Sequence, residues 1–123
     1  MAQGRRVVIT GMGAVSGAGL GWKPLWTAAR DGASVIRPLE FARDYPGRIR
    51  IGAQVPGFDA ASLIDRPTLM YCDPFTQYAI VAADQAVAAA GLERGNVGGI
   101  DCAVILGSGI GGIRTVDDGL FNL

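Results

Sequence analysis

Two glycine-rich stretches are the parts of this sequence that could bind a ligand through their backbone. Gly107-x-Gly109-x-x-Gly112 directly follows an apolar run, and Gly11-x-Gly13-x-x-Ser16 nearly repeats its spacing. In dinucleotide-binding proteins such glycines let a pyrophosphate approach a helix N-terminus, and an acidic residue follows about 20 positions later. After residues 11–16 only Asp31 lies near that distance, and residues 107–112 lie too close to the last residue to show one. Tight turns and close backbone packing are the favoured interpretation of both, and no cofactor is expected.

Side chains that could do covalent or acid–base chemistry are scarce. The sequence has no histidine, so no Ser-His or Cys-His pair can form within it. Cys72 and Cys102 are far apart and make a poor metal site. Cys102 lies in an apolar run and is expected in the core. Cys72 precedes a helix start, where the helix dipole favours a thiolate, but a small residue in a turn is the favoured interpretation. We therefore expect no catalytic residue and no metal site in this chain.

The element expected to position the later glycines is a helix over residues 73–91. Asp73 is a good N-cap, Pro74 is tolerated at the first helical position, and Gly91 is a typical left-handed stop. Apolar residues recur at the spacing of one helix face: Phe75, Tyr78, Ala79, Ala82, Ala83, Ala86 and Ala90. The opposite face is also largely apolar, which predicts burial on several sides.

Apolar runs at residues 7–10 and 102–106 predict two interior strands, each followed by glycines. A helix that leads to a buried strand ending in glycines is how α/β proteins build a site. Between these strands and after them, the sequence predicts five further segments. They are a helix from about Pro24 to Gly32, a surface loop over 34–47, a half-exposed strand over 48–55, a short helix over 59–64 closed by Pro67, and a helix over 113–123.

This alternation of strands and helices predicts an α/β layered fold, and no linker divides 1–123 into two domains. Eleven basic and eleven acidic residues cancel, which argues against a nucleic-acid binder. Two cysteines do not make a secreted disulfide framework, so a cytoplasmic location is expected. No segment resembles a signal peptide or approaches the roughly 20 apolar residues of a membrane helix.

Three stretches, taken in order, resemble one enzyme family. They are Arg5-Arg6-Val7-Val8-Ile9-Thr10-Gly11-Met12-Gly13-Ala14-Val15-Ser16, then Asp73-Pro74-Phe75-Thr76-Gln77-Tyr78-Ala79-Ile80-Val81-Ala82-Ala83, and Gly107-Ser108-Gly109-Ile110-Gly111-Gly112. Together they resemble the N-terminal part of the β-ketoacyl-acyl-carrier-protein synthases, especially the type II elongating enzymes (3-oxoacyl-acyl-carrier-protein synthase II). The similarity spans nearly all of 1–123.

The resemblance implies part of the N-terminal half of a thiolase-type layered fold, and a homodimer. It implies an acyltransferase of fatty-acid or polyketide synthesis. An acyl group passes to a cysteine, and malonyl on acyl-carrier protein is then decarboxylated and condensed to a 3-oxoacyl product. In the family the nucleophile and two histidines lie beyond the glycine loop that residues 107–112 resemble. Neither Cys72 nor Cys102 takes the nucleophile's place, so the chain is expected to be an inactive N-terminal portion of the domain.

The residues that the resemblance assigns are on the substrate side. Ile110 is implied to reach the bottom of the acyl pocket near the dimer interface. Its loop neighbours are implied to shape that pocket: Gly107, Ser108, Gly109, Gly111 and Gly112. Bacterial members usually carry several basic residues before the Asp73 motif, thought to meet the carrier protein. Here residues 66–72 hold only Arg66, so carrier docking falls to Arg48 and Arg50 or the partner differs.

Two other functions remain open. One is a non-catalytic partner that sets chain length, which shares the fold but lacks the nucleophile. The other is a small nucleotide-binding α/β module built on residues 107–112.

Overall fold

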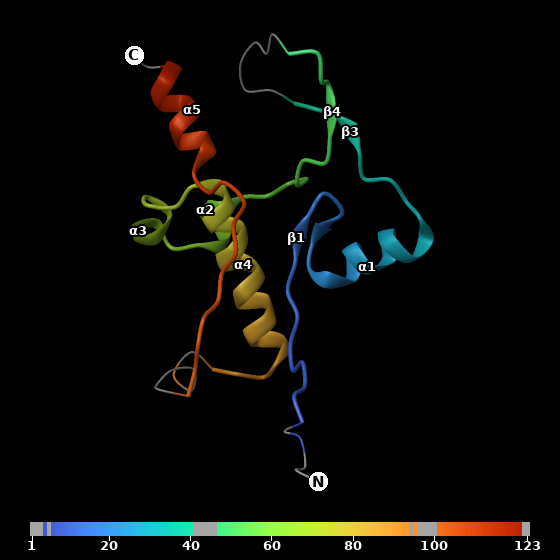
Figure 1. The fold of residues 1–123 in the computed structure, drawn as a ribbon, viewed down its shortest axis with the longest axis vertical. Helices are drawn as coiled ribbons and strands as arrows, with labels where there is room; N and C mark the ends of the chain where they lie inside the picture. Colours follow the sequence, from blue (N-terminus) through green and yellow to red (C-terminus); the bar gives the residue numbers. More distant parts are fainter. Residues whose placement is uncertain (1–3, 5, 41–46, 94, 96–100, 122–123) are drawn as a thin grey trace.

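The structure is a computed structural model that describes residues 4, 6–40, 47–93, 95 and 101–121 (Figure 1). In order, its elements are β1 (Val15–Ser16), β2 (Gly19–Leu20), α1 (Trp22–Asp31), β3 (Arg37–Pro38), β4 (Ile51–Gly52), α2 (Ala60–Leu63), α3 (Arg66–Leu69), α4 (Pro74–Ala89) and α5 (Ile113–Phe121). The strands form two antiparallel pairs, β1 with β2 and β3 with β4. The described chain is thus a mixture of helices and short hairpins.

Helix α4 is the central element, and it confirms the helix predicted over 73–91. Pro74 occupies its first turn. At its end Gly91 takes a positive φ of 67°, and the amides of Gly91 and Leu92 donate to carbonyls of the last turn, which is a glycine-terminated helix end. Val81 in α4 is 5% exposed and Ile64, just after α2, is 6% exposed, and these are the buried hydrophobic side chains of the described chain.

An aromatic contact joins α4 to the chain before α2. The rings of Phe58 and Tyr78 meet edge to face, with centroids 4.8 Å apart, a favoured geometry for aromatic pairs. Tyr78 therefore has the packing role that its place on the apolar face predicted. Most other residues of α4 are only half-buried, which is less cover than the expected burial on several sides.

The N-terminal segment lies against α4 at van der Waals distance because it carries glycines. A Cβ atom built on Gly11 would lie 2.0 Å from the carbonyl oxygen of Ala86, and one on Gly13 would lie 1.9 Å from that of Ala82. Two residues of extended chain span about 6–7 Å, and four residues of helix rise about 6 Å. Glycines two apart therefore face helix residues four apart. The backbone amide of Ala14 completes the contact by donating to the Gln85 side chain at 3.0 Å.

The two interior strands predicted at 7–10 and 102–106 are wrong for the described chain. Neither segment pairs with a described strand, and their side chains face solvent: Val7 is 90% exposed, Val104 95% and Ile105 94%. An apolar run favours extended backbone, but a strand also needs a neighbour to take its backbone hydrogen bonds. Cys102 is exposed as well, which corrects its expected place in the core.

The smaller elements agree with the sequence where a local signal defines them. Gly32, at φ 63°, ends α1 as expected. The Asp59 carboxylate accepts the amide of Ala61 at 3.1 Å, which caps α2. Pro67 does not close that helix, because it lies in the first turn of α3.

The longer segments that the sequence predicted are confirmed only in part. The loop expected over 34–47 contains β3, the strand expected over 48–55 is reduced to β4, and α5 confirms the last predicted helix. Residues 41–46 and 122–123 of these predictions lie outside the described residues. Helix α1 is little covered by the rest of the described chain, since Trp26 is 60% exposed.

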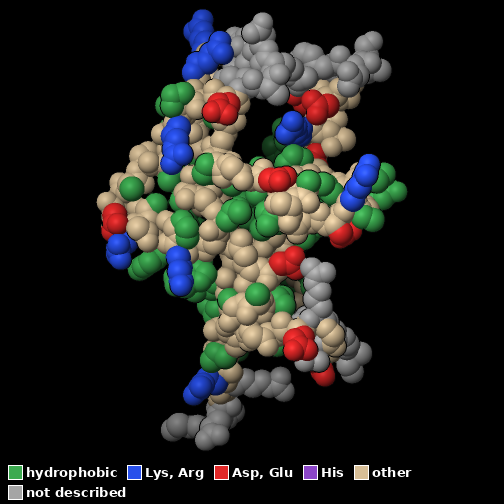
Figure 2. Space-filling model, turned by 180° about the vertical axis from the view of Figure 1, so that it is seen from behind, with side chains coloured by type: hydrophobic (Ala, Val, Ile, Leu, Met, Phe, Trp, Pro, Cys, Tyr) green, Lys and Arg blue, Asp and Glu red, His purple; other side chains and the backbone are tan. Residues whose placement is uncertain are grey.

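Hydrophobic and charged side chains share the surface. Figure 2 shows hydrophobic groups at the surface between basic and acidic ones, with both signs of charge scattered over the face drawn. None of the helices in the described ranges has the length and apolar character that crossing a bilayer requires.

The glycine contact with α4 leads to a stability prediction. Gly13→Ala should lower the free energy of unfolding by ~1–3 kcal/mol, because the new methyl group overlaps the Ala82 carbonyl and forces the segment away from the helix. Urea titration followed by circular dichroism measures the change. Gly119→Ala is the matched control: it lies inside α5 with nothing within 4 Å, and should stabilise by ~0.5–1 kcal/mol. Equal effects of the two substitutions would contradict the packing role.

Candidate functional site

Residues 107–112, which we call the glycine loop, join the extended segment after residue 101 to α5. Only the end of the loop contacts the rest of the described chain. Gly111 has a positive φ of 75°, and a Cβ there would lie 3.7 Å from the Phe75 ring. A Cβ on Gly107 or Gly109 would meet nothing within 4 Å. Ile110 is 79% exposed, so the described residues form no enclosed pocket around it. The structure thus places two of the six predicted residues, Gly111 and Gly112, against the start of α4.

The contact that holds the end of the glycine loop is made by Asp73. Its Oδ2 accepts the Thr115 hydroxyl at 2.6 Å and the Thr115 backbone amide at 3.1 Å. Thr115 lies in the first turn of α5, where amides have no partner within the helix. Gly112, just before that helix, has no side chain to cap it. Asp73 therefore caps α5 from 42 residues away in sequence.

This contact changes the role predicted for Asp73. Its backbone is extended and its carbonyl accepts the amides of Thr76 and Gln77, as expected for the residue that starts α4. Its side chain, however, makes no capping bond to α4. The prediction of the helix start was right, and the sequence did not predict that the carboxylate would bind the first turn of α5. The sequence did not indicate that Thr115 would bind Asp73, because the two residues belong to different segments of the chain.

The cap also bears on nucleotide binding. A dinucleotide fingerprint places pyrophosphate at the N-terminus of the helix that follows it, which here is α5. That position already holds the Asp73 carboxylate, and a Cβ on Gly112 would lie 3.4 Å from its Oδ2. At the other glycine stretch, Gly11 and Gly13 face helix backbone. Both arrangements favour backbone packing over the nucleotide-binding alternative.

Hydrogen bonding lowers the pKa of Asp73 below its ordinary value of 3.8. The main cause is the Thr115 hydroxyl, which donates to the ionised carboxylate. The backbone amides of Thr115 and Phe75 and the nearby charge of Arg114 act in the same direction, and desolvation opposes them. Arg114 itself lies 3.8 Å from Asp118 one turn further along α5. The junction therefore favours an ionised Asp73.

A cavity of about 460 Å³ opens beside this cap. It is lined by Met70, Tyr71, Cys72, Asp73, Pro74, Gln77, Arg114, Thr115 and Asp118. Cys72 is half-buried here, and its carbonyl accepts the Gln77 side-chain amide at 2.8 Å. In the described ranges no cluster of three or more His, Cys, Asp or Glu residues could hold a metal ion. The cavity is thus a polar junction between α5 and the start of α4.

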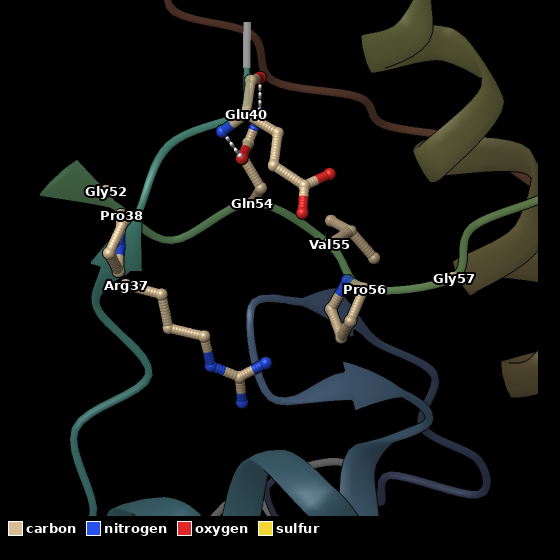
Figure 3. Close-up of a pocket in the computed structure, with 8 residues that line it drawn as sticks. All are labelled: Arg37, Pro38, Glu40, Gly52, Gln54, Val55, Pro56 and Gly57. Carbon is tan, nitrogen blue, oxygen red and sulfur yellow. Dashed lines mark hydrogen bonds between the residues drawn. The ribbon is translucent and has the colours of Figure 1, made fainter. Parts of the chain in front are cut away.

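A second cavity, of about 370 Å³, lies between the β3–β4 pair and the chain that follows it. Figure 3 shows the Arg37 guanidinium directed into this opening, with Gln54 above it. Gln54 exchanges two 2.8 Å hydrogen bonds with the Glu40 backbone and so fixes the wall of the cavity. The sequence gave no signal for this opening, because it depends on a pairing inside an expected loop. Arg48 and Arg50, suggested for carrier docking, are exposed on the approach to β4.

Comparison with known proteins decides the family. The model of the beta-ketoacyl synthase N-terminal domain matches residues 4–120. The chain belongs to this family. It is 38% identical over 117 residues to a 3-oxoacyl-[acyl-carrier-protein] synthase 2 of Staphylococcus aureus, which covers 95% of this chain and 28% of the relative. Proteins of the same name from Coxiella burnetii and Synechocystis are 36% and 31% identical, over 92% and 93% of this chain.

The resemblance seen in the three sequence stretches is thereby confirmed. The chain spans about 28% of the length of the curated relatives that it matches.

The lowered pKa of Asp73 predicts a dependence of stability on pH. A carboxylate whose folded pKa lies below its unfolded value stabilises the fold above pH 3.8, and the contribution is lost as the pH falls through the folded pKa. Asp73→Asn should therefore be less stable than the parent at neutral pH, and the difference should shrink in strongly acidic solution. Unfolding at a series of pH values from neutral to acidic measures this.

Two further variants test whether the hydrogen bond from Thr115 to Asp73 causes this pH dependence. Thr115→Val should reduce the same pH dependence, because it removes the hydroxyl donor while keeping the side-chain shape. Glu93→Gln removes an exposed carboxylate at the other end of α4 and serves as the control. A constant difference between Asp73→Asn and the parent at every pH would contradict the assignment.

Proposed function

We propose that this chain forms the N-terminal portion of the N-terminal domain of a 3-oxoacyl-[acyl-carrier-protein] synthase. The observation that carries the proposal is the family match over residues 4–120. The relatives named above bear that enzyme's name and align with nearly the whole chain. In this proposal the enzyme condenses acyl groups with malonyl carrier protein in fatty-acid or polyketide synthesis, as a cytoplasmic homodimer of the thiolase-type layered fold.

The surface of the described chain supports the layered architecture. Residues 7–10 and 102–106 are apolar and extended, and they are exposed at the places where the sequence pattern predicts interior strands. Large exposed apolar surfaces in a soluble protein usually mark an interface. In a layered fold further strands and helices would cover these segments.

In the proposed enzyme, the catalytic residues lie outside this chain. The sequence contains no histidine that could activate Cys72 or Cys102. The acyl group would be held on a cysteine elsewhere, attacked by the carbanion that malonyl decarboxylation generates. What this chain would supply is the glycine loop, with Ile110 limiting the depth of the acyl pocket.

A chimera tests the proposed function directly. The matching N-terminal part of the Staphylococcus aureus synthase is replaced by residues 1–123, and condensation of an acyl primer with malonyl carrier protein is assayed. Retained condensation supports the proposal. A folded, dimeric chimera that still acylates its own cysteine but cannot condense would favour the non-catalytic, chain-length-setting alternative.

The chain by itself should form no acyl adduct. Incubation with acyl-carrier protein followed by intact mass spectrometry is expected to leave it unmodified, because neither cysteine has an activating base. The Staphylococcus aureus synthase, treated in parallel, shows that the acyl donor is competent. Stoichiometric acylation of Cys72 or Cys102 would overturn the assignment of catalysis to residues outside this chain.

Substitution of Ile110 should change the accepted acyl length in the chimera. A larger side chain at the end of a narrow apolar pocket penalises long primers, and one methylene is worth ~1–3 kcal/mol in such pockets. Ile110→Phe should therefore lower kcat/KM for long primers by roughly 10- to 200-fold while sparing short ones, and Ile110→Ala should relax the limit.

Primers of graded length provide the measurement for these variants. Ile36→Phe makes the same change at an exposed position near β3 and controls for general effects. An unchanged length profile in both Ile110 variants would show that this residue is not part of the pocket.

A further inference from the structure

Within the described residues, the contacts that hold the glycine loop are at its C-terminal end and are made with residues 73–75. Gly111 packs against the Phe75 ring, Gly112 lies beside the Asp73 carboxylate, and Thr115 donates two hydrogen bonds to that carboxylate. Further back, Gly107 and Gly109 have open space around their Cα atoms. The position of the loop relative to α4 therefore depends on how α5 is fixed to the start of α4.

Asp73 supplies the polar part of this fixation. A carboxylate that accepts both an amide and a hydroxyl from the first turn of a helix satisfies an otherwise unpaired donor and complements the helix dipole. The bond to the hydroxyl, at 2.6 Å, has the short length of a charge-assisted hydrogen bond. The two residues directly before α5, Gly111 and Gly112, have no side chain that could cap it. Removing Asp73 leaves α5 without this cap.

The charged and titratable groups around the contact are few. From α5, Arg114 and Asp118 line the same cavity; from the segment before α4, Tyr71 and Cys72 do. Arg114 is the one basic group among the residues that line this cavity, and it favours the ionised carboxylate. Because Cys72 lies next to Asp73 and borders α5 across the cavity, its accessibility reports whether α5 is in place.

We propose that Asp73 is the positioning residue of the glycine loop: by capping α5 through Thr115, it holds residues 111 and 112 against the first turn of α4. This inference rests on the proposed function for the meaning of the loop, and on the described contacts alone for the anchoring. Asp73 acts through the loop and touches no substrate. Its loss should free the loop and with it the side chain of Ile110.

The anchoring is tested on the 123-residue chain by thiol labelling. The chain contains two cysteines, of which Cys102 is exposed and serves as an internal reference for half-buried Cys72. Asp73→Ala should raise the labelling rate of Cys72 relative to Cys102 by about 2- to 30-fold, the range that loss of a capping interaction implies. Thr115→Val should raise it less, because the amide donor remains. Thr115→Ser keeps both donors and should restore the parental ratio.

Two comparisons separate positioning from general loss of structure. Asp59→Ala removes the cap of α2, so it matches the chemical change away from α5, and should leave the Cys72 ratio unchanged. Asp73→Asn keeps an acceptor oxygen but removes the charge, so it should raise the ratio less than Asp73→Ala does. The proposal is overturned if Asp73→Ala leaves the ratio at the parental value, or if Asp59→Ala raises it equally.

The consequence for substrate selection is tested in the chimera. Asp73→Ala should flatten the dependence of kcat/KM on primer length while keeping kcat for short primers close to that of the parent chimera. A positive labelling result with an unchanged length profile keeps the anchoring and overturns the substrate role of the loop. An unchanged labelling ratio overturns the anchoring, whatever the chimera does.

Discussion

The constraint on which the described structure depends is the close approach of an extended backbone to a helix. Gly11 and Gly13 lie so near α4 that any side chain would overlap the carbonyls of Ala86 and Ala82. Helix α4 allows this close approach because Ala82 and Ala86, which face the glycines, have side chains that project little from the helix. Once the segment is seated, the amide of Ala14 reaches Gln85, and the β1–β2 hairpin and α1 follow from that point. The spacing of these glycines thus serves the packing of two backbones.

The second glycine stretch shows that similar spacing serves another purpose. In the glycine loop, Gly111 adopts a positive φ, and Gly112 has no side chain and so leaves room for the Asp73 carboxylate. The anion at the N-terminus of α5 is then a side chain of the protein itself. Helix N-termini attract anions of any origin, so a glycine pattern before a helix does not by itself identify a nucleotide site.

The sequence predicted the features of this structure that short stretches determine. Asp59 and Gly32 mark a helix start and a helix end through bonds to residues within a few positions, and the bounds of α4 follow from Pro74 and Gly91. Predictions that needed a distant partner were wrong or missing. Residues 102–106 have the composition of a strand, yet no described strand takes their hydrogen bonds. Asp73 was identified as a cap, but its partner Thr115 could not be found from spacing along the chain.

Family membership and the exposed apolar segments support each other. If residues 1–123 formed a complete small domain, the apolar runs would be expected to lie in its core, since burial of apolar surface is the main favourable term in folding. Instead Val104 and Ile105 are almost fully exposed, while two hydrophobic residues in the described chain, Ile64 and Val81, are buried. The relatives are more than three times as long as the matched region. The described chain has strand-like segments without a neighbouring strand, and one cap, from Asp73 to Thr115, that joins two helices 42 residues apart in sequence. Both features agree with a chain that spans only part of the length of its relatives.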